Sequence, residues 1–210
     1  MFYISGPPGE IYSTTATITM SMRNIITYDL FENEGSEISQ SLFRQMQQRY
    51  NVFERGLIRA WGGVLYLGYH NLPEEGPVVR REDYERELSH YATLDEEDPE
   101  FEDMYDWFSD APPRMGGRAL FNKRILREDF RRMAEKTLTP FDMVIYRTSE
   151  IEEPGLNSYT IKKGAYSNPQ LKERAYLIPA GTPLVFASDI ADDGEIIWDP
   201  TQEELAEYSI

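Results

Sequence analysis

Polar and apolar residues alternate near the start of the chain, and this alternation predicts a β-strand. In the segment "IYSTTATITMSM", residues 11–22, hydroxyl side chains share one face and mostly apolar side chains share the other. A period of two is typical of a strand with one solvated side. We therefore predict that residues 1–35 form a β-rich N-terminal extension.

Beyond this extension, apolar residues recur every three or four positions, which predicts helices. One stripe runs from Ile38 to Leu57 and predicts a single helix over residues 36–58. Gly62 and Gly63 are expected to end the helical region before a strand, "VLYLGYH".

Two further helices are predicted, over residues 81–91 and 118–138. The second has a wide apolar face, and Pro140 follows it. Proline disrupts a helix because it has no N–H group to donate. Residues 36–140 are thus predicted as the helical part of a single domain.

The second half of the chain, residues 141–210, is predicted to be β-rich. Short runs of β-branched and aromatic residues alternate with turn residues, as is typical of strands and hairpins. Thr201 and Glu204 have the spacing of a capping box, which predicts a short terminal helix. The predicted fold class is α+β, and the strand candidates are "FDMVIYR", "LNSYTI", "RAYLIP", "PLVFA" and "EIIW".

Composition narrows the classes of partner. The 210 residues are 40% hydrophobic, which is sufficient for a packed domain. The formal net charge is −16, and such a surface repels phosphate backbones and anionic membranes. Nucleic acid is therefore an unlikely partner on charge grounds, whereas a basic protein would be attracted.

The chain has no cysteine and only two histidines, which excludes disulfides, thiolate metal sites and histidine-rich metal sites. Its N-terminus lacks the pattern of a signal peptide, and no apolar run approaches the length of a membrane span. These features predict a cytoplasmic protein without a membrane segment.

Two charged segments stand out. Residues 95–110 carry nine carboxylates, yet their spacing does not match a calcium-binding loop. We predict that this segment is mobile or faces a partner. The predicted helix 118–138 has a strongly basic face. This face is either a solvated surface that offsets the acidic loop or a docking site for an anionic partner.

Polar residues follow the predicted strands of the second half in a particular order. Arg147 ends the first strand, and Ser158 and Thr160 share one face of the next because side chains repeat every two residues. Later, Asp193 and Glu195 stand two residues apart where the last strand begins.

This order resembles the mono-ADP-ribosyltransferases of the arginine–serine–glutamate class, found among bacterial toxins and phage-encoded enzymes. In that family a Tyr-Arg pair ends a core strand, a Ser-x-Ser type strand follows, and a Glu-x-Glu type loop closes the site. An "IP-x-G-T" turn, present here at residues 178–182, commonly stands before the last motif. The resemblance covers roughly residues 120–200 and implies a β core of two packed sheets.

The resemblance implies that NAD is a substrate. Arg147 would clamp the pyrophosphate, since a guanidinium can bind phosphate oxygens with two parallel hydrogen bonds. Tyr146, Ser158 and Thr160 would complete the NAD-binding strands. We predict that Arg147 and Glu195 face one cleft.

The catalytic roles follow from breaking the nicotinamide bond, which develops positive charge on the ribose. Glu195 would stabilise that charge, Asp193 would orient or deprotonate the acceptor, and Ser158 would hold the nicotinamide side or support Glu195. The middle motif departs from Ser-Thr-Ser, and Ser167 is a second candidate for its serine. Asp193 stands where the family has Glu or Gln, and this difference affects which acceptor the enzyme would be specific for.

The expected function is transfer of ADP-ribose from NAD to a protein side chain by a phage or bacterial effector, acting in the host cytoplasm if phage-encoded. Two alternatives remain open. One is a non-catalytic binding or virion-associated domain, and the other is a hydrolase that uses the Asp193 and Glu195 carboxylates.

Overall fold

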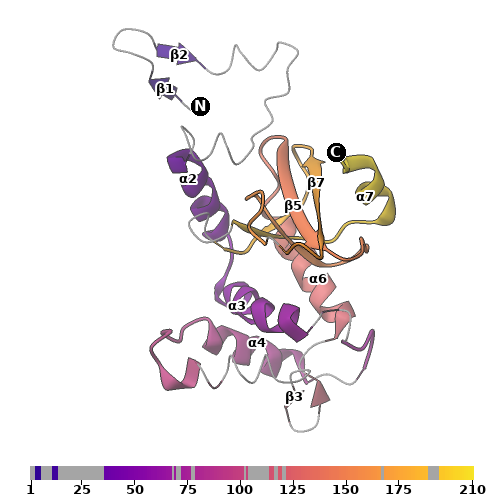
Figure 1. Cartoon of the computed structure of the whole chain (residues 1–210). Coiled ribbons are helices and arrows are strands. Elements are labelled where there is room, and N and C mark those ends of the chain that lie inside the picture. Colours follow the sequence, from indigo (N-terminus) through magenta and orange to yellow (C-terminus); the bar gives the residue numbers. More distant parts are fainter. Residues whose placement is uncertain are drawn as a thin grey trace.

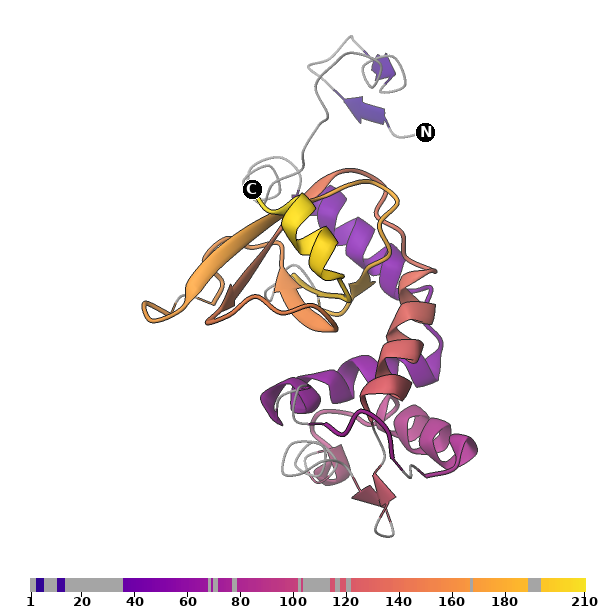
Figure 2. The same cartoon turned by 90° about the vertical axis from the view of Figure 1, so that its right-hand side faces the viewer.

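The chain folds into a mixed α/β structure with a helical lobe and a β-lobe, as predicted (Figure 1). Helix α6 (Lys123–Ala134) runs between the two lobes (Figure 2). The computed structural model describes residues 3–5, 11–13, 36–67, 69, 72–76, 79–101, 103, 114–115, 118–119, 122–166, 168–188 and 194–210.

The first helical stretch is two helices, not the single predicted one. Helix α2 (Ser36–Gln47) ends before Asn51, and α3 (Val52–Leu67) begins after it. The Asn51 side chain accepts a hydrogen bond from Glu54 N, and Asn51 N donates to the Glu54 carboxylate. This reciprocal pair satisfies N–H groups that the first turn of a helix leaves unpaired, and it fixes where α3 starts.

Helix α3 also continues past the adjacent glycines at positions 62 and 63. Gly62 and Gly63 lie inside it, so the strand predicted from residue 64 is wrong for residues 64–67, which are helical. Glycine lowers helix propensity by only about 1 kcal/mol, and tertiary packing overrides this cost. Trp61, one residue before the glycines, is buried against Phe130 of α6 with ring centroids 4.8 Å apart.

Helix α4 (Arg81–Tyr91) has the predicted bounds and packs closely on α3. The contact is made by backbone: a β-carbon added to Gly56 would lie 1.7 Å from the Leu88 carbonyl oxygen. The two helix axes therefore approach as closely as they do only because residue 56 has no side chain.

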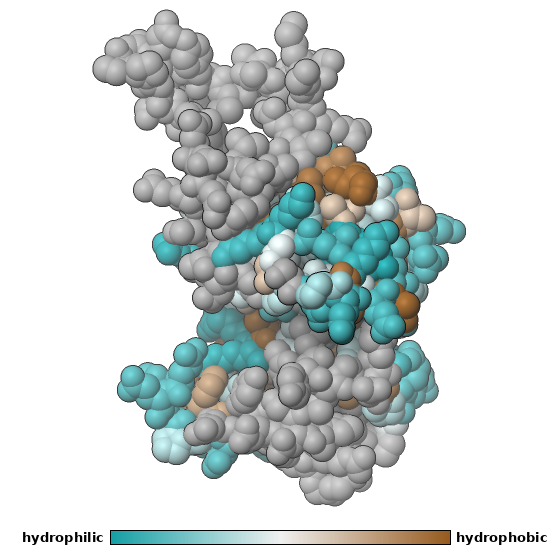
Figure 3. All heavy atoms as spheres, in the orientation of Figure 1, coloured by the Kyte–Doolittle hydropathy of each residue, from teal (hydrophilic) through white to brown (hydrophobic). Residues whose placement is uncertain are grey.

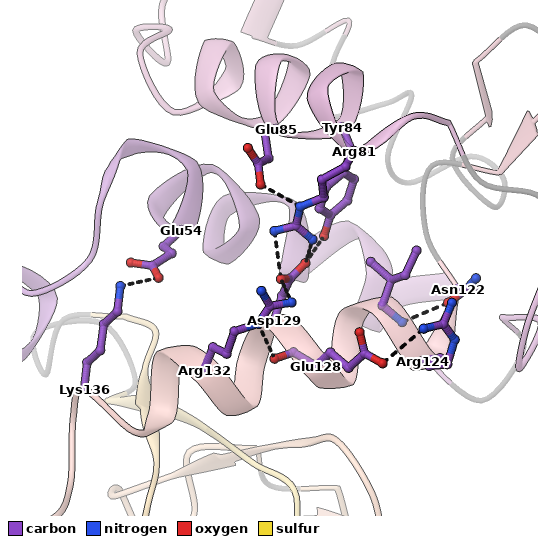
Figure 4. A network of polar contacts seen from close by, with 11 residues as sticks. Glu54, Arg81, Tyr84, Glu85, Asn122, Arg124, Glu128, Asp129, Arg132 and Lys136 are labelled. Carbon is purple, nitrogen blue, oxygen red and sulfur yellow. Dashed lines mark hydrogen bonds and ion pairs between the residues drawn. The ribbon is translucent and has the colours of Figure 1, made fainter.

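A buried carboxylate joins α4 to α6 (Figure 4). The Asp129 side chain is 3% exposed and accepts two hydrogen bonds from the Arg81 guanidinium, at 2.9 and 3.0 Å. The Tyr84 hydroxyl donates to it at 3.1 Å, and Arg132 adds an ion pair at 3.0 Å. Burial, together with this carboxylate, raises the pKa of Tyr84 well above its usual value. The charge of Asp129 is thus compensated on several sides, as a buried ion requires.

The basic face of α6 forms ion pairs within the chain. The face is solvated, as one sequence interpretation expects, since Arg131 and Arg132 are 61% and 59% exposed, but its acidic partners among the described residues come from elsewhere than the acidic segment. The side chains leave no row of unpaired cations for an anionic partner among the described residues of this helix. The pairs are Lys123–Glu74, Arg124–Glu75, Arg124–Glu128, Arg127–Glu74, Arg127–Asp199, Arg131–Asp199, Arg132–Asp129 and Lys136–Glu54.

The β-lobe is built on one five-stranded antiparallel sheet, with strand order β7-β5-β6-β9-β8. Each predicted run overlaps one of these strands, although β5 and β7 extend two residues beyond their runs. The described residues add only two short strand pairs, so the second packed sheet of the expected core is not confirmed. The strands are β5 (Met143–Ser149), β6 (Asn157–Thr160), β7 (Lys172–Ile178), β8 (Val185–Phe186) and β9 (Glu195–Trp198).

The two faces of this sheet pack on different helices. On one face, which we call the α7 face, a core cluster includes Ile145 and Tyr159 with residues of α2 and of α7 (Gln202–Tyr208). On the other, the α6 face, Val185 and Ile197 join the core of the helical lobe. The predicted capping box of Thr201 and Glu204 opens α7 and is confirmed.

The two lobes are tied together by the hydroxyl of Tyr50, just after α2. It accepts a hydrogen bond from Phe186 N of β8 at 3.0 Å and lies 3.1 Å from Thr137 Oγ1. Thr137 in turn donates to the Leu184 carbonyl oxygen at 2.5 Å. Burial raises the pKa of Tyr50 to about 12. Side chains therefore satisfy the N–H group of Phe186 in the edge strand β8 and the carbonyl group of Leu184 just before it.

Replacing Tyr50 with phenylalanine is expected to lower the free energy of unfolding by about 1–3 kcal/mol, because the buried Phe186 N–H loses its acceptor while the ring packing remains. Urea unfolding followed by circular dichroism measures this effect. An unchanged unfolding midpoint would show that the hydroxyl carries no net stability.

The remaining described segments are short. Strand β1 (Tyr3–Ser5) pairs with β2 (Ile11–Ser13), so part of the predicted N-terminal strand is confirmed, while residues 14–22 lie outside the described residues. Strand β3 (Arg114–Met115) pairs with β4 (Arg118–Ala119), where the sequence predicted the start of a helix. No helix in the described part of the chain is long and apolar enough to cross a membrane.

Part of the acidic segment packs on the helical lobe. The Phe101 ring stacks on Tyr91 with centroids 5.3 Å apart, and the Arg59 guanidinium lies 5.2 Å from the Phe101 centroid. Residues 102 and 104–110 of this segment lie outside the described residues. Among those described, no three His, Cys, Asp or Glu side chains gather as a metal site.

Candidate functional site

The structure brings two of the predicted site residues into direct contact. Ser158 Oγ donates a hydrogen bond to Glu195 Oε1 from the neighbouring strand. Strands β6 and β9 are antiparallel, with Thr160 opposite Glu195 and Ser158 opposite Ile197. Residues opposite each other share a face, so Ser158, Thr160 and Glu195 all lie on the α6 face. Ser158 and Glu195 are half-buried, which leaves the pair partly open to solvent.

The backbone around Glu195 is held from both sides. Gly194 has φ +62°, and a β-carbon there would lie 2.5 Å from the Ile161 side chain, so glycine is required by conformation and by space. Ile161 N donates to the Gly194 carbonyl at 3.2 Å. On the other side, Glu195 N donates to Ser188 Oγ at 2.8 Å. The carboxylate therefore projects from a fixed position at the start of β9.

Tyr146 and Thr160, both predicted to bind NAD, differ in how far they are exposed to solvent. They are direct partners between β5 and β6, and thus lie on the same face as Glu195. Tyr146 is half-buried, but Thr160 is only 2% exposed and its Oγ1 accepts a hydrogen bond from Lys162 N at 2.9 Å. Thr160 thus supports the strand end rather than lining an open surface.

Arg147 lies on the other face of the sheet. It follows Tyr146 in β5, so its side chain points to the α7 face, and its guanidinium lies 5.5 Å from the ring centroid of Tyr159. Contrary to the sequence prediction, the structure does not bring Arg147 and Glu195 into one cleft. The physical reason is the strand period of two: a difference of one residue in register reverses the face.

Several polar groups lie close to Arg147 on the α7 face. Its Nη1 atom and the Tyr159 hydroxyl are both buried and find no hydrogen-bond partner among the described residues. Burial raises the pKa of Tyr159, and the positive charge of Arg147 acts in the opposite direction. Across the sheet, Arg147 pairs with Arg174 of β7, which donates to Ser149. A cation over an aromatic ring is a stabilising contact in itself.

Two other predicted site residues, Asp193 and Ser167, lie outside the described residues. The sequence interpretation also missed Ser188, because nothing in the run "FASD" marks it as a partner for a distant backbone N–H. The role of Gly194 was partly visible, since Asp-Gly is a strong turn signal. Its close contact with Ile161 depends on strand pairing, which local sequence does not specify.

The arrangement is therefore a half-buried carboxylate, oriented by a serine hydroxyl, at the start of a central strand. Such a group can stabilise a developing positive charge or accept a proton. Comparisons with protein-family models, with curated proteins and with solved structures found no match to this chain.

Proposed function

We propose that the protein transfers ADP-ribose from NAD to a protein side chain and releases nicotinamide. The observation that carries the proposal is the hydrogen bond from Ser158 to Glu195. It agrees with one of the two roles that the family resemblance implies for this serine, which is to support the glutamate. The proposal includes the finer fold, an ADP-ribosyltransferase-like core of which the five-stranded sheet is the described part.

The chemistry requires a negative charge beside the ribose. As the bond to nicotinamide breaks, the anomeric carbon gains oxocarbenium character, as in glycoside hydrolysis. A carboxylate held on a rigid strand stabilises this charge without reorganising during the reaction. Glu195 has this placement because Gly194 and Ser188 fix its backbone while Ser158 fixes its carboxylate. Asp193, two residues earlier, would orient or deprotonate the acceptor side chain.

The position of Arg147 changes one part of this proposal. On the α7 face, its guanidinium does not share a surface with Glu195. The NAD phosphates would then be bound by cations other than Arg147, and Arg147 would stabilise the sheet by its contact with Tyr159. The proposed setting, an effector of phage or bacterial origin in a host cytoplasm, follows from the resemblance alone.

The position of Arg147 on the α7 face also favours a second candidate, a binding or assembly domain that does not catalyse a reaction. If the sheet has kept its architecture but not the arginine clamp, the protein would recognise a partner and leave NAD unchanged. The acidic surface then suits a basic protein partner. For this candidate, we expect no binding of NAD and no release of nicotinamide.

The deciding experiment measures NAD binding and consumption by the purified protein. We expect NAD to raise the melting temperature, since a ligand that binds only the folded state stabilises it. We also expect nicotinamide release, and labelling of a protein in cell extract supplied with labelled NAD. If the protein neither binds nor consumes NAD, the transferase proposal is rejected in favour of the binding domain.

The variant Arg147→Lys tests the revised role of Arg147. Lysine keeps the charge but cannot form the paired hydrogen bonds of a guanidinium. Because Arg147 faces away from Glu195, we expect an unchanged KM for NAD. A KM raised about tenfold or more, with unchanged stability, would show that Arg147 binds the phosphates after all.

A further inference from the structure

The pairing of β8 with β9 becomes irregular at Glu195. The register is regular as far as the pair of Phe186 and Ile196. Beyond this pair, the carbonyl oxygen of Glu195 accepts hydrogen bonds from both Ala187 N, at 2.9 Å, and Ser188 N, at 3.4 Å. Two residues of one strand thus lie opposite a single residue of the other, which is the pattern of a β-bulge.

The bulge gives the N–H group of Glu195 a side-chain acceptor. In a regular antiparallel ladder, a hydrogen-bonded pair of residues exchanges two backbone hydrogen bonds. Here Glu195 N donates instead to Ser188 Oγ, at 2.8 Å. A link that is ordinarily independent of the side chains therefore depends on which residue occupies position 188, and alanine there would remove it.

Glu195 is held differently by its two neighbouring strands. A bulge bends the strand pair and re-aims the side chains beside it, and bulges are frequent next to active sites. On the β8 side the bulge holds the backbone of Glu195, while on the β6 side Ser158 donates to its carboxylate. The contact of the carboxylate with Ser158 therefore depends on where the bulge places the backbone.

A bulge can also protect a sheet edge, because an exposed edge strand can pair with another chain. Strand β8 is an edge of the five-stranded sheet. However, Phe186 N already bonds to Tyr50 within the chain, and the described surface of the β-lobe is largely hydrophilic in the view of Figure 3. Edge protection therefore accounts for the bulge less well than the positioning of Glu195 does.

Ser188 also directly precedes residues 189–193, the segment that includes Asp193. A residue that acts through Glu195 would affect the cleavage of NAD itself. A residue that acts through Asp193 would affect only the transfer to the acceptor. The hydrogen bond from Glu195 N to the Ser188 hydroxyl favours the first of these two routes.

We propose that Ser188 is a positioning residue, which holds the Glu195 carboxylate against Ser158. It acts through Glu195 and not on the substrate itself. This inference rests on the proposed function, because the ribose cation is the charge that the positioned carboxylate would face. A misplacement of about 1 Å can lower a catalysed rate about 10²-fold, so the loss of one bond to the backbone of Glu195 is expected to be measurable.

The test compares Ser188→Ala with the conservative variant Ser188→Thr and with a matched control, Ser149→Ala. Ser149 Oγ, at the end of β5, donates to the Ile151 carbonyl oxygen at 2.8 Å. The control therefore also loses a hydrogen bond between a serine and the backbone. Alternation along β5 places Ser149 with Arg147 on the α7 face, away from Glu195.

The first readout requires no NAD. Carbon-13 NMR of protein labelled at glutamate follows the side-chain carboxyl resonance of Glu195, which is assigned by its absence in Glu195→Gln. We expect Ser188→Ala to shift this resonance in the same direction as Ser158→Ala, because both variants lose the contact between the carboxylate and the Ser158 hydroxyl. Ser188→Thr and Ser149→Ala are expected to leave the resonance unchanged.

The second readout is the release of nicotinamide in the absence of an acceptor. We expect kcat to fall about tenfold in Ser188→Ala, with an unchanged KM for NAD, and to be restored in Ser188→Thr. The control Ser149→Ala is expected to keep the wild-type rate. Thermal unfolding is expected to change little, because Ser188 is half-buried and water can replace the lost acceptor.

An unchanged Glu195 resonance in Ser188→Ala would overturn the inference, even if the rate fell. A loss of transfer to protein without a loss of nicotinamide release would also overturn it, because Ser188 would then act through the segment that includes Asp193. If the resonance shifts as expected but the wild type consumes no NAD, Ser188 still positions Glu195, and the transferase proposal alone is rejected.

Discussion

Replacing Gly56 with alanine is expected to unfold the helical lobe or to cost about 3 kcal/mol or more of unfolding free energy. The added β-carbon would lie 1.7 Å from the Leu88 carbonyl oxygen and 2.5 Å from its carbonyl carbon. These are backbone atoms, so no side-chain rotamer relieves the clash, and α3 and α4 must separate. Separation exposes the cluster that Trp61, Tyr84 and Leu88 share.

Gly76→Ala is the matched control. A β-carbon at Gly76 meets nothing within 4 Å, and the position is exposed. We expect the control to change stability by no more than about 0.5 kcal/mol. Thermal unfolding and urea titration measure both variants. A Gly56→Ala protein as stable as the control would mean that α3 and α4 do not approach as described.

Replacing Glu195 with glutamine is expected to lower the rate of ADP-ribose transfer about 10²–10³-fold, or roughly 3–4 kcal/mol in activation free energy. Glutamine keeps the size of the side chain and can still accept a hydrogen bond from Ser158, but it lacks the charge that faces the ribose cation. Because Glu195 is half-buried and its backbone is held independently, the melting temperature is expected to change little.

Glu207→Gln serves as the control for this second prediction, since it removes the same charge from an exposed position on α7. Nicotinamide release and protein labelling are measured for both variants, together with thermal unfolding. Retention of the wild-type rate by Glu195→Gln would reject the catalytic role of Glu195. A fall in rate that only parallels a fall in stability would point to a structural role.

Local signals predicted much of the fold. The strands of the β-lobe and helix α4 lie where the hydrophobic pattern places them, and the capping box at Thr201 predicted the start of α7. The errors lie where tertiary contacts override local propensity. Gly62 and Gly63 are predicted to end a helix that packing maintains, and the reciprocal hydrogen bonds of Asn51 and Glu54 divide a stretch whose apolar stripe is continuous.

The candidate site was predictable only in part. Strand pairing determines that Ser158 meets Glu195, and the sequence prediction of a supporting serine anticipated this contact as one possibility. Arg147 is expected to end its strand, but β5 continues to Ser149. The face on which Arg147 lies relative to Glu195 depends on the register between β5 and β6, which local sequence does not specify.

The bond between Tyr50 and Phe186 has a consequence for how the chain folds as it is made. The two residues are 136 positions apart. At about 5–20 residues per second, roughly 7–27 s separate their synthesis on a ribosome. During this interval the helical lobe lacks Val185 and Ile197, which complete its core. The nascent chain therefore exposes apolar surface until its last strands emerge, and this is the period in which a chaperone has most to protect.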